Sequence, residues 1–322
     1  IVSSQIEEHK EFGGVVPEIA ARAHVEKIEF IIKKALKESN LDLNNINGIS
    51  ATAGPGLIVC LTVGLNAGKA IAGSLKKPFV AVNHLEGHAL SPKINNKIKF
   101  PYLLLLISGG HTQFLEVNGV NNYKRLGTTI DDALGEAFDK TAKLLGIEFP
   151  GGPKIEEWAK KGNENYFKLP KPILKKGGCN LSFAGLKTAV LRTSKELKNQ
   201  KEKYHLAASF QKTINEILYE KTKIAMKEFL KNKKDKQKTF VIAGGVAANL
   251  SIRDNLSKLA KEKKFSSIFP PTNLCSDNAA MIAWAGIERY KINLIDNLEF
   301  LSRSRWPLDN SAPFLKGPGL KL

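Results

Sequence analysis

Hydrophobic positions along this chain follow two patterns, long segments with helical spacing and short, fully apolar runs. Apolar residues that recur every three or four positions are typical of amphipathic helices, and short apolar runs bounded by glycine or polar residues are typical of buried strands. Helices are expected at residues 17–37, 57–75, 131–145, 205–230, 247–261 and 277–290, and strands at 46–53, 79–82, 101–107, 111–117 and 239–243. Because the strands alternate with helices, the predicted fold class is α/β.

Two of the expected strands end in paired glycines. Gly109 and Gly110 follow one buried run, and Gly244 and Gly245 follow another. Glycine at such a turn lets backbone N–H groups approach a phosphate closely. One turn of this kind is weak evidence, but two in one α/β chain indicate two lobes that hold a nucleotide between them.

Length and composition agree with two lobes and with a cytoplasmic protein. The chain has 322 residues, of which 43% are hydrophobic, enough for sizeable cores. The longest apolar stretch, 57–75, is interrupted by glycines, Asn66 and Lys69, so no membrane span is expected. No secretory signal is visible, and three separated cysteines suit a reducing compartment. An organellar location is the alternative.

The charge balance favours a polyanionic partner such as RNA. The chain carries 49 basic and 31 acidic residues, a formal net charge of +18. A basic surface attracts nucleic acid. Solvated lysines at helix ends would give the same surplus, so the charge supports an RNA partner without establishing one.

A pair of histidines forms the first candidate for chemistry. His84 and His88 are separated by one helical turn, so on a helix they lie on one face and can share a metal ion. Glu86 lies about 200° around the helix from His84. It therefore points away from the metal face, and a zinc-protease mechanism would lack its general base. The alternative interpretation is a surface histidine pair.

Asp277 is the candidate third ligand. It begins the expected helix 277–290, where an aspartate can equally serve only as an N-cap. Two histidines and one aspartate would leave open metal positions and suit iron or zinc.

The segment 131–140 is dense in carboxylates. On a helix, Asp132, Glu136 and Asp139 would share one face, and Asp131 could cap the helix. Such carboxylates can bind ribose hydroxyls, hold a metal-bound water or act as a base. A solvated acidic face is the alternative.

These segments together resemble the TsaD family of tRNA threonylcarbamoyltransferases. The resemblance covers nearly the whole chain, in order, through residues 9–18, 83–88, 108–113, 131–140, 151–153, 182–188, 244–249, 275–281 and 303–308. It implies the two-lobed, actin-like and sugar-kinase-like (ASKHA) fold of that family. The expected lobes are 1–104 and 105–290, with 291–322 returning to the first lobe.

The resemblance also implies an activity. The threonylcarbamoyl group of threonylcarbamoyl-AMP would be transferred to N6 of the adenosine 3′ of the anticodon, in tRNAs that read codons beginning with A. His84, His88 and Asp277 would bind one divalent metal ion, iron (Fe²⁺) or zinc. The residues expected to bind the adenylate are Leu106, Ile107, Ser108, Gly109, Gly110, Asp139, Gly152, Glu156 and Asn249, with His111, Glu136, Gly244 and Gly245 as further candidates.

The expected partners are tRNA, a TsaB-like shortened paralogue and a TsaE-like ATPase. Family members begin with an acidic strand and turn that would precede Ile1, so this chain is expected to lack that strand and its proposed catalytic acids. No catalytic residue is therefore assigned. The alternatives to a transferase are a sugar-kinase-like ATPase, a metalloprotease and a non-enzymatic scaffold.

Overall fold

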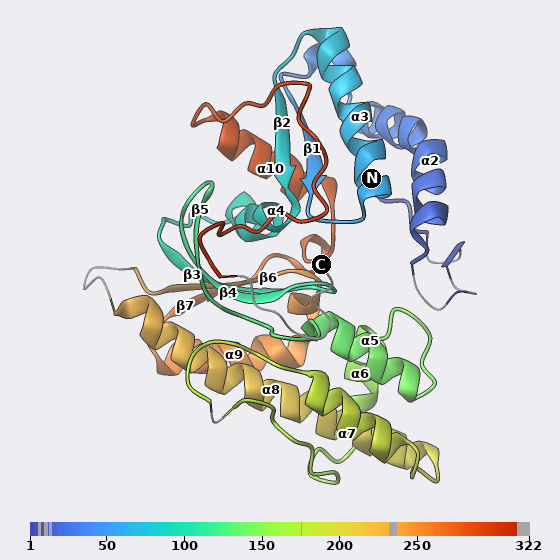
Figure 1. Cartoon of the computed structure of the whole chain (residues 1–322), viewed down its shortest axis with the longest axis vertical. Coiled ribbons are helices and arrows are strands. Elements are labelled where there is room, and N and C mark those ends of the chain that lie inside the picture. Colours follow the sequence, from blue (N-terminus) through green and yellow to red (C-terminus); the bar gives the residue numbers. More distant parts are fainter. Residues whose placement is uncertain (6–7, 10–11, 13–14, 175, 232–236, 314–322) are drawn as a thin grey trace. The chain divides into compact units, whose positions relative to one another are not determined.

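The computed structural model describes residues 1–322 except 6–7, 10–11, 13–14, 175, 232–236 and 314–322 (Figure 1). Residue contacts divide the chain into two compact units. Ile1–Ile94 and Asp277–Asn310 form the first unit, and Asn95–Ser276 and Ser311–Leu322 form the second. The last helix belongs to the first unit because it packs on the two strands there, which differs from the expected lobe ranges 1–104 and 105–290.

The first unit is built on two parallel strands with a helix on each face. Its elements are α2 (Pro17–Glu38), a 3-10 turn (Leu43–Asn45), β1 (Ile49–Gly54), α3 (Ile58–Leu75), β2 (Phe79–Asn83), α4 (His84–Leu90), a second 3-10 turn (Ser91–Ile94) and α10 (Ala279–Tyr290). Gly68 of α3 lies against Ala51, whereas Gly286 of α10 lies against Ser50. Because neighbouring strand residues point to opposite faces, α3 and α10 cover opposite faces of the pair.

The chain after α10 returns along the two strands. The backbone N–H of Asp296 donates to the carbonyl of Phe79 at 2.9 Å, and the N–H of Arg303 donates to the carbonyl of Ala53 at 2.7 Å. These bonds satisfy backbone groups of β2 and β1 that would otherwise lie at a sheet edge.

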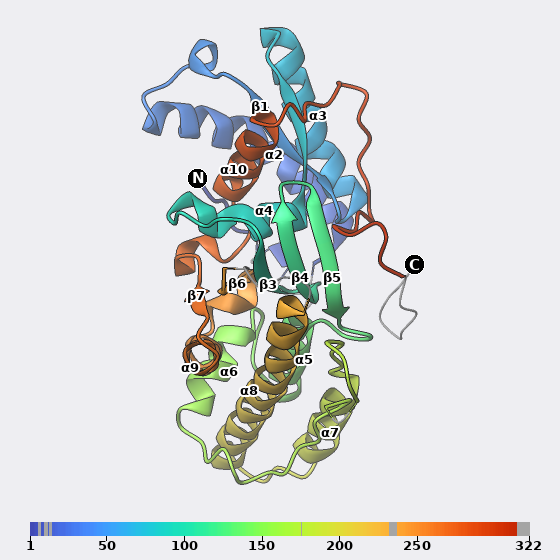
Figure 2. The same ribbon diagram turned by 90° about the vertical axis from the view of Figure 1, so that its left-hand side faces the viewer.

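The second unit contains a five-stranded mixed sheet in the order β5-β4-β3-β6-β7. Its elements are β3 (Tyr102–Ile107), β4 (Thr112–Gly119), β5 (Asn122–Thr128), α5 (Leu134–Leu144), α6 (Gly152–Ala159), α7 (Ala184–Ser194), α8 (Gln200–Leu230), β6 (Thr239–Ala243), α9 (Leu250–Glu262) and β7 (Ser266–Ile268). Strands β3, β6 and β7 are parallel, and β4 runs antiparallel to both of its neighbours, β3 and β5. Helices α8 and α9 pack on one face of the sheet (Figures 1 and 2).

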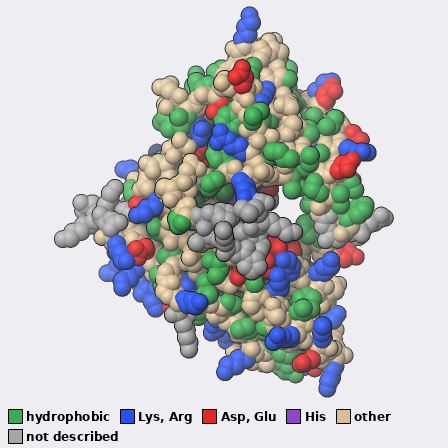
Figure 3. Space-filling model, in the orientation of Figure 1, with side chains coloured by type: hydrophobic (Ala, Val, Ile, Leu, Met, Phe, Trp, Pro, Cys, Tyr) green, Lys and Arg blue, Asp and Glu red, His purple; other side chains and the backbone are tan. Residues whose placement is uncertain are grey.

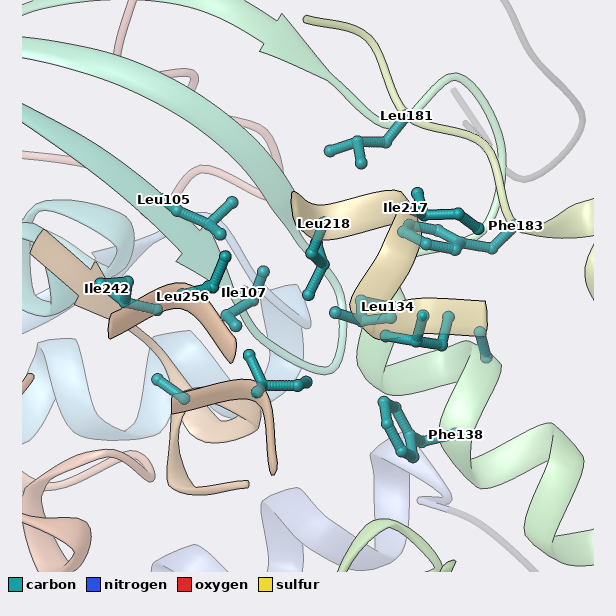
Figure 4. Close-up of a cluster of buried hydrophobic side chains, with 14 of the residues drawn as sticks. Leu105, Ile107, Leu134, Phe138, Leu181, Phe183, Ile217, Leu218, Ile242 and Leu256 are labelled. Carbon is teal, nitrogen blue, oxygen red and sulfur yellow. The ribbon is translucent and has the colours of Figure 1, made fainter. Parts of the chain in front are cut away.

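The core of the second unit lies between this sheet and its helices. Figure 4 shows Leu105 and Ile242 of the sheet facing Leu218 of α8 and Leu256 of α9, all fully buried. Burying an apolar side chain of this size contributes about 1.5–3 kcal/mol. This packing fixes the ends of β3 and β6 next to each other.

The expected helices and strands are confirmed, with some corrections. Helix α5 begins at Leu134, so Asp131 and Asp132 precede it, and the expected helix 247–261 begins at Leu250 after a 3-10 turn. Helix α8 begins at Gln200, ahead of the expected 205, and strands β5 and β7 and helices α6 and α7 were not expected. The sequence of β5 interrupts its apolar positions with lysine and arginine, because its face is only partly buried.

Helix α3 has a length and composition that would suit a membrane span, and 17% of it is buried. Its Gly68 nevertheless packs against Ala51 of β1. A core helix of a soluble protein passes the same test, so the feature is weak evidence of a membrane.

Gly286→Ala is expected to destabilise the first unit. The added methyl carbon would lie 1.8 Å from Oγ of Ser50 and 2.8 Å from its Cβ. Overpacking of this kind lowers the free energy of unfolding by about 1–3 kcal/mol, which urea denaturation measures. The matched control is Gly64→Ala in α3, where nothing lies within 4 Å, and which should stabilise by about 0.5–1 kcal/mol. Equal effects of the two substitutions would contradict the packing of α10 on β1.

Candidate functional site

Helix α4 carries the histidine pair at the end of strand β2. Asn83 caps this helix, since its Oδ1 accepts the N–H of Leu85 at 2.9 Å. His84 and His88 then lie on one face, with ring centroids 4.8 Å apart. The side chain of His88 is fully buried and that of His84 is 21% exposed. The predicted one-turn spacing therefore brings the two rings together.

Asp277 completes the cluster. Its Oδ1 lies 3.3 Å from Nε2 of His84 and 3.1 Å from Nε2 of His88. The N-cap of α10 is Asn278, whose side chain accepts the N–H of Met281 at 2.9 Å. The capping role proposed for Asp277 is thus filled by its neighbour, and its carboxylate faces the histidines. Desolvation would raise the pKa of Asp277, but hydrogen bonds from the two histidines outweigh it and hold that pKa well below its usual range.

These three side chains form a possible metal site. One ligand atom from each lies within 4.8 Å of the others. Two atoms bound about 2.0–2.1 Å from a tetrahedral metal ion stand about 3.3 Å apart. The carboxylate-to-imidazole distances of 3.1 and 3.3 Å agree with that separation. The donor set, two imidazoles and one carboxylate, leaves positions open for other ligands.

Glu86 lies on the opposite side of α4, as its position in the helix predicted. It is 1% exposed, and its Oε2 accepts a hydrogen bond from Nη1 of Arg289 at 2.9 Å. A carboxylate held in a buried ion pair is not available as the general base of a metalloprotease.

Gly87 lets α4 approach α10 closely. A Cβ at this position would lie 2.9 Å from Cδ1 of Ile282 and 3.3 Å from Cγ of Met281. A larger residue would have to displace the side chains of Ile282 and Met281. The close packing therefore sets the distance between the histidines and Asp277, which directly precedes α10.

The second unit contains a cavity of about 330 Å³. It is formed where the parallel strands β3 and β6 end, the edge of an α/β sheet at which ligands commonly bind. The lining residues are Gly109, Gly135, Phe138, Asp139, Pro150, Gly152, Pro153, Glu156, Gly245, Val246, Ala248 and Asn249. The expected residues Gly109, Asp139, Gly152, Glu156, Gly245 and Asn249 are among them.

The turn after β3 lies directly against the beginning of α5. The N–H of Gly135 donates to the carbonyl of Ser108 at 3.2 Å, and a Cβ on Gly135 would lie 2.7 Å from Cα of Gly109. Glycine at position 135 is therefore needed for the glycine turn and the N-terminus of α5 to meet.

Asp139 connects α5 to the beginning of α6. Its Oδ1 accepts the N–H of Gly151 at 3.0 Å. Burial raises the pKa of the Asp139 carboxyl, and the N–H groups of Gly151 and Gly152 offset part of that rise. The carboxylate thus holds the Pro150–Pro153 turn at the cavity.

Glu156 and Asn249 converge on the N-terminus of α9. Oε1 of Glu156 accepts the first two backbone N–H groups of α9 at 2.8 and 3.2 Å. Oδ1 of Asn249 caps the same helix, and its Nδ2 donates to Oε1 of buried Gln211 at 2.9 Å. These bonds leave the cavity with fixed polar groups at one wall.

Several expected nucleotide-binding residues lie beside the described cavity lining instead of in it. Leu106 and Ile107 are fully buried in β3. Ser108 and His111 close the turn on each other, because the N–H of Ser108 donates to the His111 carbonyl at 2.8 Å and its Oγ accepts the His111 N–H at 3.1 Å. Leu106 and Ile107 could therefore contact a ligand only through backbone groups, whereas Ser108 and His111 are partly exposed.

Gly110, Gly244 and Glu136 are likewise outside the described lining. Gly244 has a φ of 96°, and a Cβ there would lie 2.4 Å from the carbonyl oxygen of Ile107, so glycine is required where β6 meets β3. Glu136 forms an ion pair with Lys140.

The prediction that Asp132, Glu136 and Asp139 share a helical face was wrong, because α5 begins only at Leu134. Asp132 is 4% exposed and forms ion pairs with Lys140, at 3.2 Å, and with Lys187. Its role in the structure is to join the beginning of α5 to α7.

Asp131 does not cap α5 either. Its Oδ1 accepts the N–H groups of Phe183 at 2.7 Å and Ala184 at 3.3 Å, and its Oδ2 accepts from Oγ of Ser182. It thus stabilises the beginning of α7, far away in the sequence.

Comparison with known proteins identifies the family. Residues 1–284 match the family described as "TsaD: tRNA N6-adenosine threonylcarbamoyltransferase". The chain belongs to this family. A protein of that name from Pelagibacter ubique is 66% identical over 322 residues, which cover 100% of this chain and 90% of the relative. The protein of the same name from Chelativorans sp. is 52% identical, and the match covers 99% of this chain and 90% of that protein.

The fold is shared with solved structures of low sequence identity. The crystal structure of full-length HypF in the phosphate- and nucleotide-bound form has a TM-score of 0.57 at 13% identity, and the match covers 82% of this chain and 41% of HypF. The structure of T. kodakarensis HypF gives 0.57 at 15%, with 83% and 43% covered. This likeness shows the fold alone, and it confirms the α/β, ASKHA-type class expected from the motifs.

Sequence reasoning missed some residues of the family's candidate sites. Gln211 accepts a hydrogen bond from Asn249, Asn278 caps the helix that follows Asp277, and Arg289 pairs with Glu86 on the histidine helix. Nothing in their local sequence distinguishes them from ordinary helix residues, although Ser276-Asp277-Asn278 does contain a second possible cap.

In the motif at 9–18, residues 10–11 and 13–14 lie outside the described part of the chain.

Asp132→Asn is expected to lower the free energy of unfolding at pH 7 by about 2 kcal/mol, because charged hydrogen bonds from two lysines are weakened. Burial opposes ionisation of Asp132, but Lys187 and Lys140 outweigh it and hold its pKa below the usual range. Stability from a lowered carboxyl pKa is present above the unfolded-state pKa of about 4 and is lost as pH falls through the folded-state pKa. Urea denaturation of both proteins should therefore give a difference that shrinks below about pH 4. A difference independent of pH would contradict this account.

Proposed function

We propose that this chain transfers the threonylcarbamoyl group of threonylcarbamoyl-AMP to N6 of the adenosine 3′ of the anticodon, in tRNAs that read codons beginning with A. The observation that carries the proposal is the match of all 322 residues, at 66% identity, to a relative of this family, combined with the histidine–aspartate cluster and the cavity described above. The two units then correspond to the two lobes of the family's fold.

The cavity of the second unit is the proposed site for the adenylate part of the donor. Its volume of about 330 Å³ falls within the range of small-molecule pockets. Backbone N–H groups of the glycine turns at Gly109 and Gly245 are suited to phosphate oxygens. Asp139 and Glu156 are suited to ribose hydroxyls, and Asn249 to the nucleotide base. Leu106, Ile107, Ser108 and Gly110 would contribute through the backbone of the β3 end, with His111, Glu136 and Gly244 supporting the surrounding turns.

His84, His88 and Asp277 are the proposed ligands of one divalent metal ion. Two imidazoles and one carboxylate with open positions form the donor set that suits iron(II), and zinc takes the same donors. An ion held there supplies a Lewis acid with positions open to substrate oxygens.

The chain's own contribution to the reaction is binding and orientation. The donor is a mixed anhydride with a good leaving group, whereas the exocyclic amine of adenine is a weak nucleophile because its lone pair is conjugated with the ring. Holding the amine against the carbonyl carbon can lower the activation free energy by about 7–11 kcal/mol. Fixed N–H groups at the glycine turns stabilise charge that develops on the AMP leaving group. No covalent enzyme intermediate is needed, and burial raises the pKa of the Cys179 thiol to about 11, so it is a poor nucleophile.

tRNA, a shortened paralogue and a small ATPase are the proposed partners, and the cytoplasm is the proposed location. Lys and Arg side chains lie over both units on the face seen in Figure 3, interspersed with Asp and Glu. The +18 charge favours association with RNA. The cysteines at 60, 179 and 275 are free thiols, which suits a reducing compartment.

The direct test is an assay with synthetic threonylcarbamoyl-AMP and unmodified tRNA. The chain is incubated with both substrates and the two companion proteins, and threonylcarbamoyladenosine is measured in digested tRNA by mass spectrometry. His88→Ala should lower the rate by at least about 100-fold, since loss of a ligand costs more than loss of an outer partner.

The matched control is His205→Ala, because His205 stacks on Tyr166 in the second unit. It lies outside the histidine–aspartate cluster and the cavity lining. Its rate should stay near that of the wild type. The Pelagibacter ubique relative serves as the positive control. Product from the relative but none from this chain would overturn the proposal, and ATP hydrolysis without tRNA would favour a sugar-kinase-like ATPase.

A further inference from the structure

The buried ion pair between Glu86 and Arg289 has no role in the proposed transfer reaction. Glu86 lies on α4 between the two histidines, and Arg289 lies in the last turn of α10. Their side chains are 1% and 8% exposed, and Oε2 of Glu86 lies 2.9 Å from Nη1 of Arg289. The pair therefore connects the helix that carries two proposed metal ligands to the helix that follows the third.

We infer that the Glu86–Arg289 ion pair is a positioning device that fixes the rotation of α4 about its own axis, and thereby the placement of His84 and His88 relative to Asp277. The inference rests on the metal site of the proposed function. Glu86 projects from α4 on the side away from the histidines, about 200° around the helix from His84. Contacts on two opposite sides of α4 restrain its rotation, whereas the histidine–aspartate contact alone acts on one side.

The magnitudes support a role in positioning. Side-chain tips lie about 5 Å from a helix axis, so a rotation of about 10° moves them by about 1 Å. Metal–ligand distances tolerate only about 0.2 Å. Gly87 allows α4 and α10 to pack closely, since a Cβ there would meet Ile282 and Met281. Rotation is thus the remaining freedom of α4 that would most disturb the ligand geometry.

The orientation of the His88 ring depends strongly on the placement of α4. Metal-binding histidines usually donate their second ring nitrogen to a partner that orients the ring. Nδ1 of His88 is buried and has no hydrogen-bond partner among the described residues. Apart from the contact of its Nε2 with Asp277, the ring is therefore oriented by packing and by the position of α4, on which the ion pair acts.

A merely stabilising role is the alternative explanation. Burying two charges costs desolvation energy, and a buried ion pair can often be replaced by apolar residues of similar volume without loss of stability. Removing one partner alone would leave an unpaired buried charge. The resulting loss of stability could not then be separated from a change in the placement of the metal ligands. The double variant Glu86→Leu with Arg289→Met removes both charges and retains the packing volume.

The test compares metal binding with stability in the full chain. After removal of metal by a chelator, Zn²⁺ affinity is measured by competition with a fluorescent chelator, and bound Co²⁺ is examined by its visible absorption. We expect the double variant to keep the midpoint of thermal unfolding of the metal-free wild type, and to bind Zn²⁺ about 10–100-fold more weakly. Its Co²⁺ bands should be shifted or weakened, a change that a purely structural role would not cause.

The matched control is Lys93→Met. Lys93 forms a mostly buried pair with Glu288 of α10 at 3.6 Å, but it lies in the 3-10 turn after α4, outside the helix that carries the histidines. Its Zn²⁺ affinity and Co²⁺ spectrum should match those of the wild type. Should the double variant fail to fold, Glu86→Gln with Arg289→Gln, which also removes both charges, is measured in the same way with the same expected weakening.

Wild-type Zn²⁺ affinity and an unchanged Co²⁺ spectrum in a folded charge-removed variant would overturn this inference alone. Equal weakening in Lys93→Met would also overturn it, because the effect would then belong to any ion pair at α10. A wild type that binds Zn²⁺ no better than His88→Ala would instead overturn the proposed metal site, and this inference with it.

Discussion

The contact between α4 and α10 is the interaction on which the candidate metal site depends. Gly87 allows the close approach, and the position of Asn278 as the cap of α10 leaves Asp277 facing the two histidines. Helix α10 itself is held against β1 at Gly286, and α4 is a direct continuation of β2. The strand pair therefore places both helices, and residues far apart in the sequence come together at one point.

In the second unit, packing likewise brings residues from distant parts of the chain together, here at one edge of the sheet. Buried packing of β3 and β6 against α8 and α9 aligns the two strand ends, and glycines at both ends keep side chains out of the space beyond them. Asp139 and Glu156 then attach α6 to this edge through backbone N–H groups. The cavity is thus a result of backbone geometry, with a few polar side chains added to its walls.

Much of this could be predicted from the sequence, where a local pattern carries the information. The one-turn spacing of His84 and His88 predicts a shared helical face, and the position of Glu86 predicts that it points away. Whether Asp277 caps a helix or binds with the histidines could not be decided locally, because Asn278 offers an equally good cap one residue later. The partners of Asp131 and Asp132 could not be predicted either, since Ser182 and Lys187 are brought to them only by tertiary packing.

X-ray absorption spectroscopy of the zinc-loaded chain would test the metal site most directly, because it identifies the donor atoms. The account predicts a shell of nitrogen and oxygen atoms at about 2.0–2.1 Å, with the outer-shell scattering of two imidazoles. In His88→Ala the imidazole signal should fall to that of one ring. A sulfur shell at about 2.3 Å, as a ligand such as Cys275 would give, or no imidazole scattering at all, would contradict it.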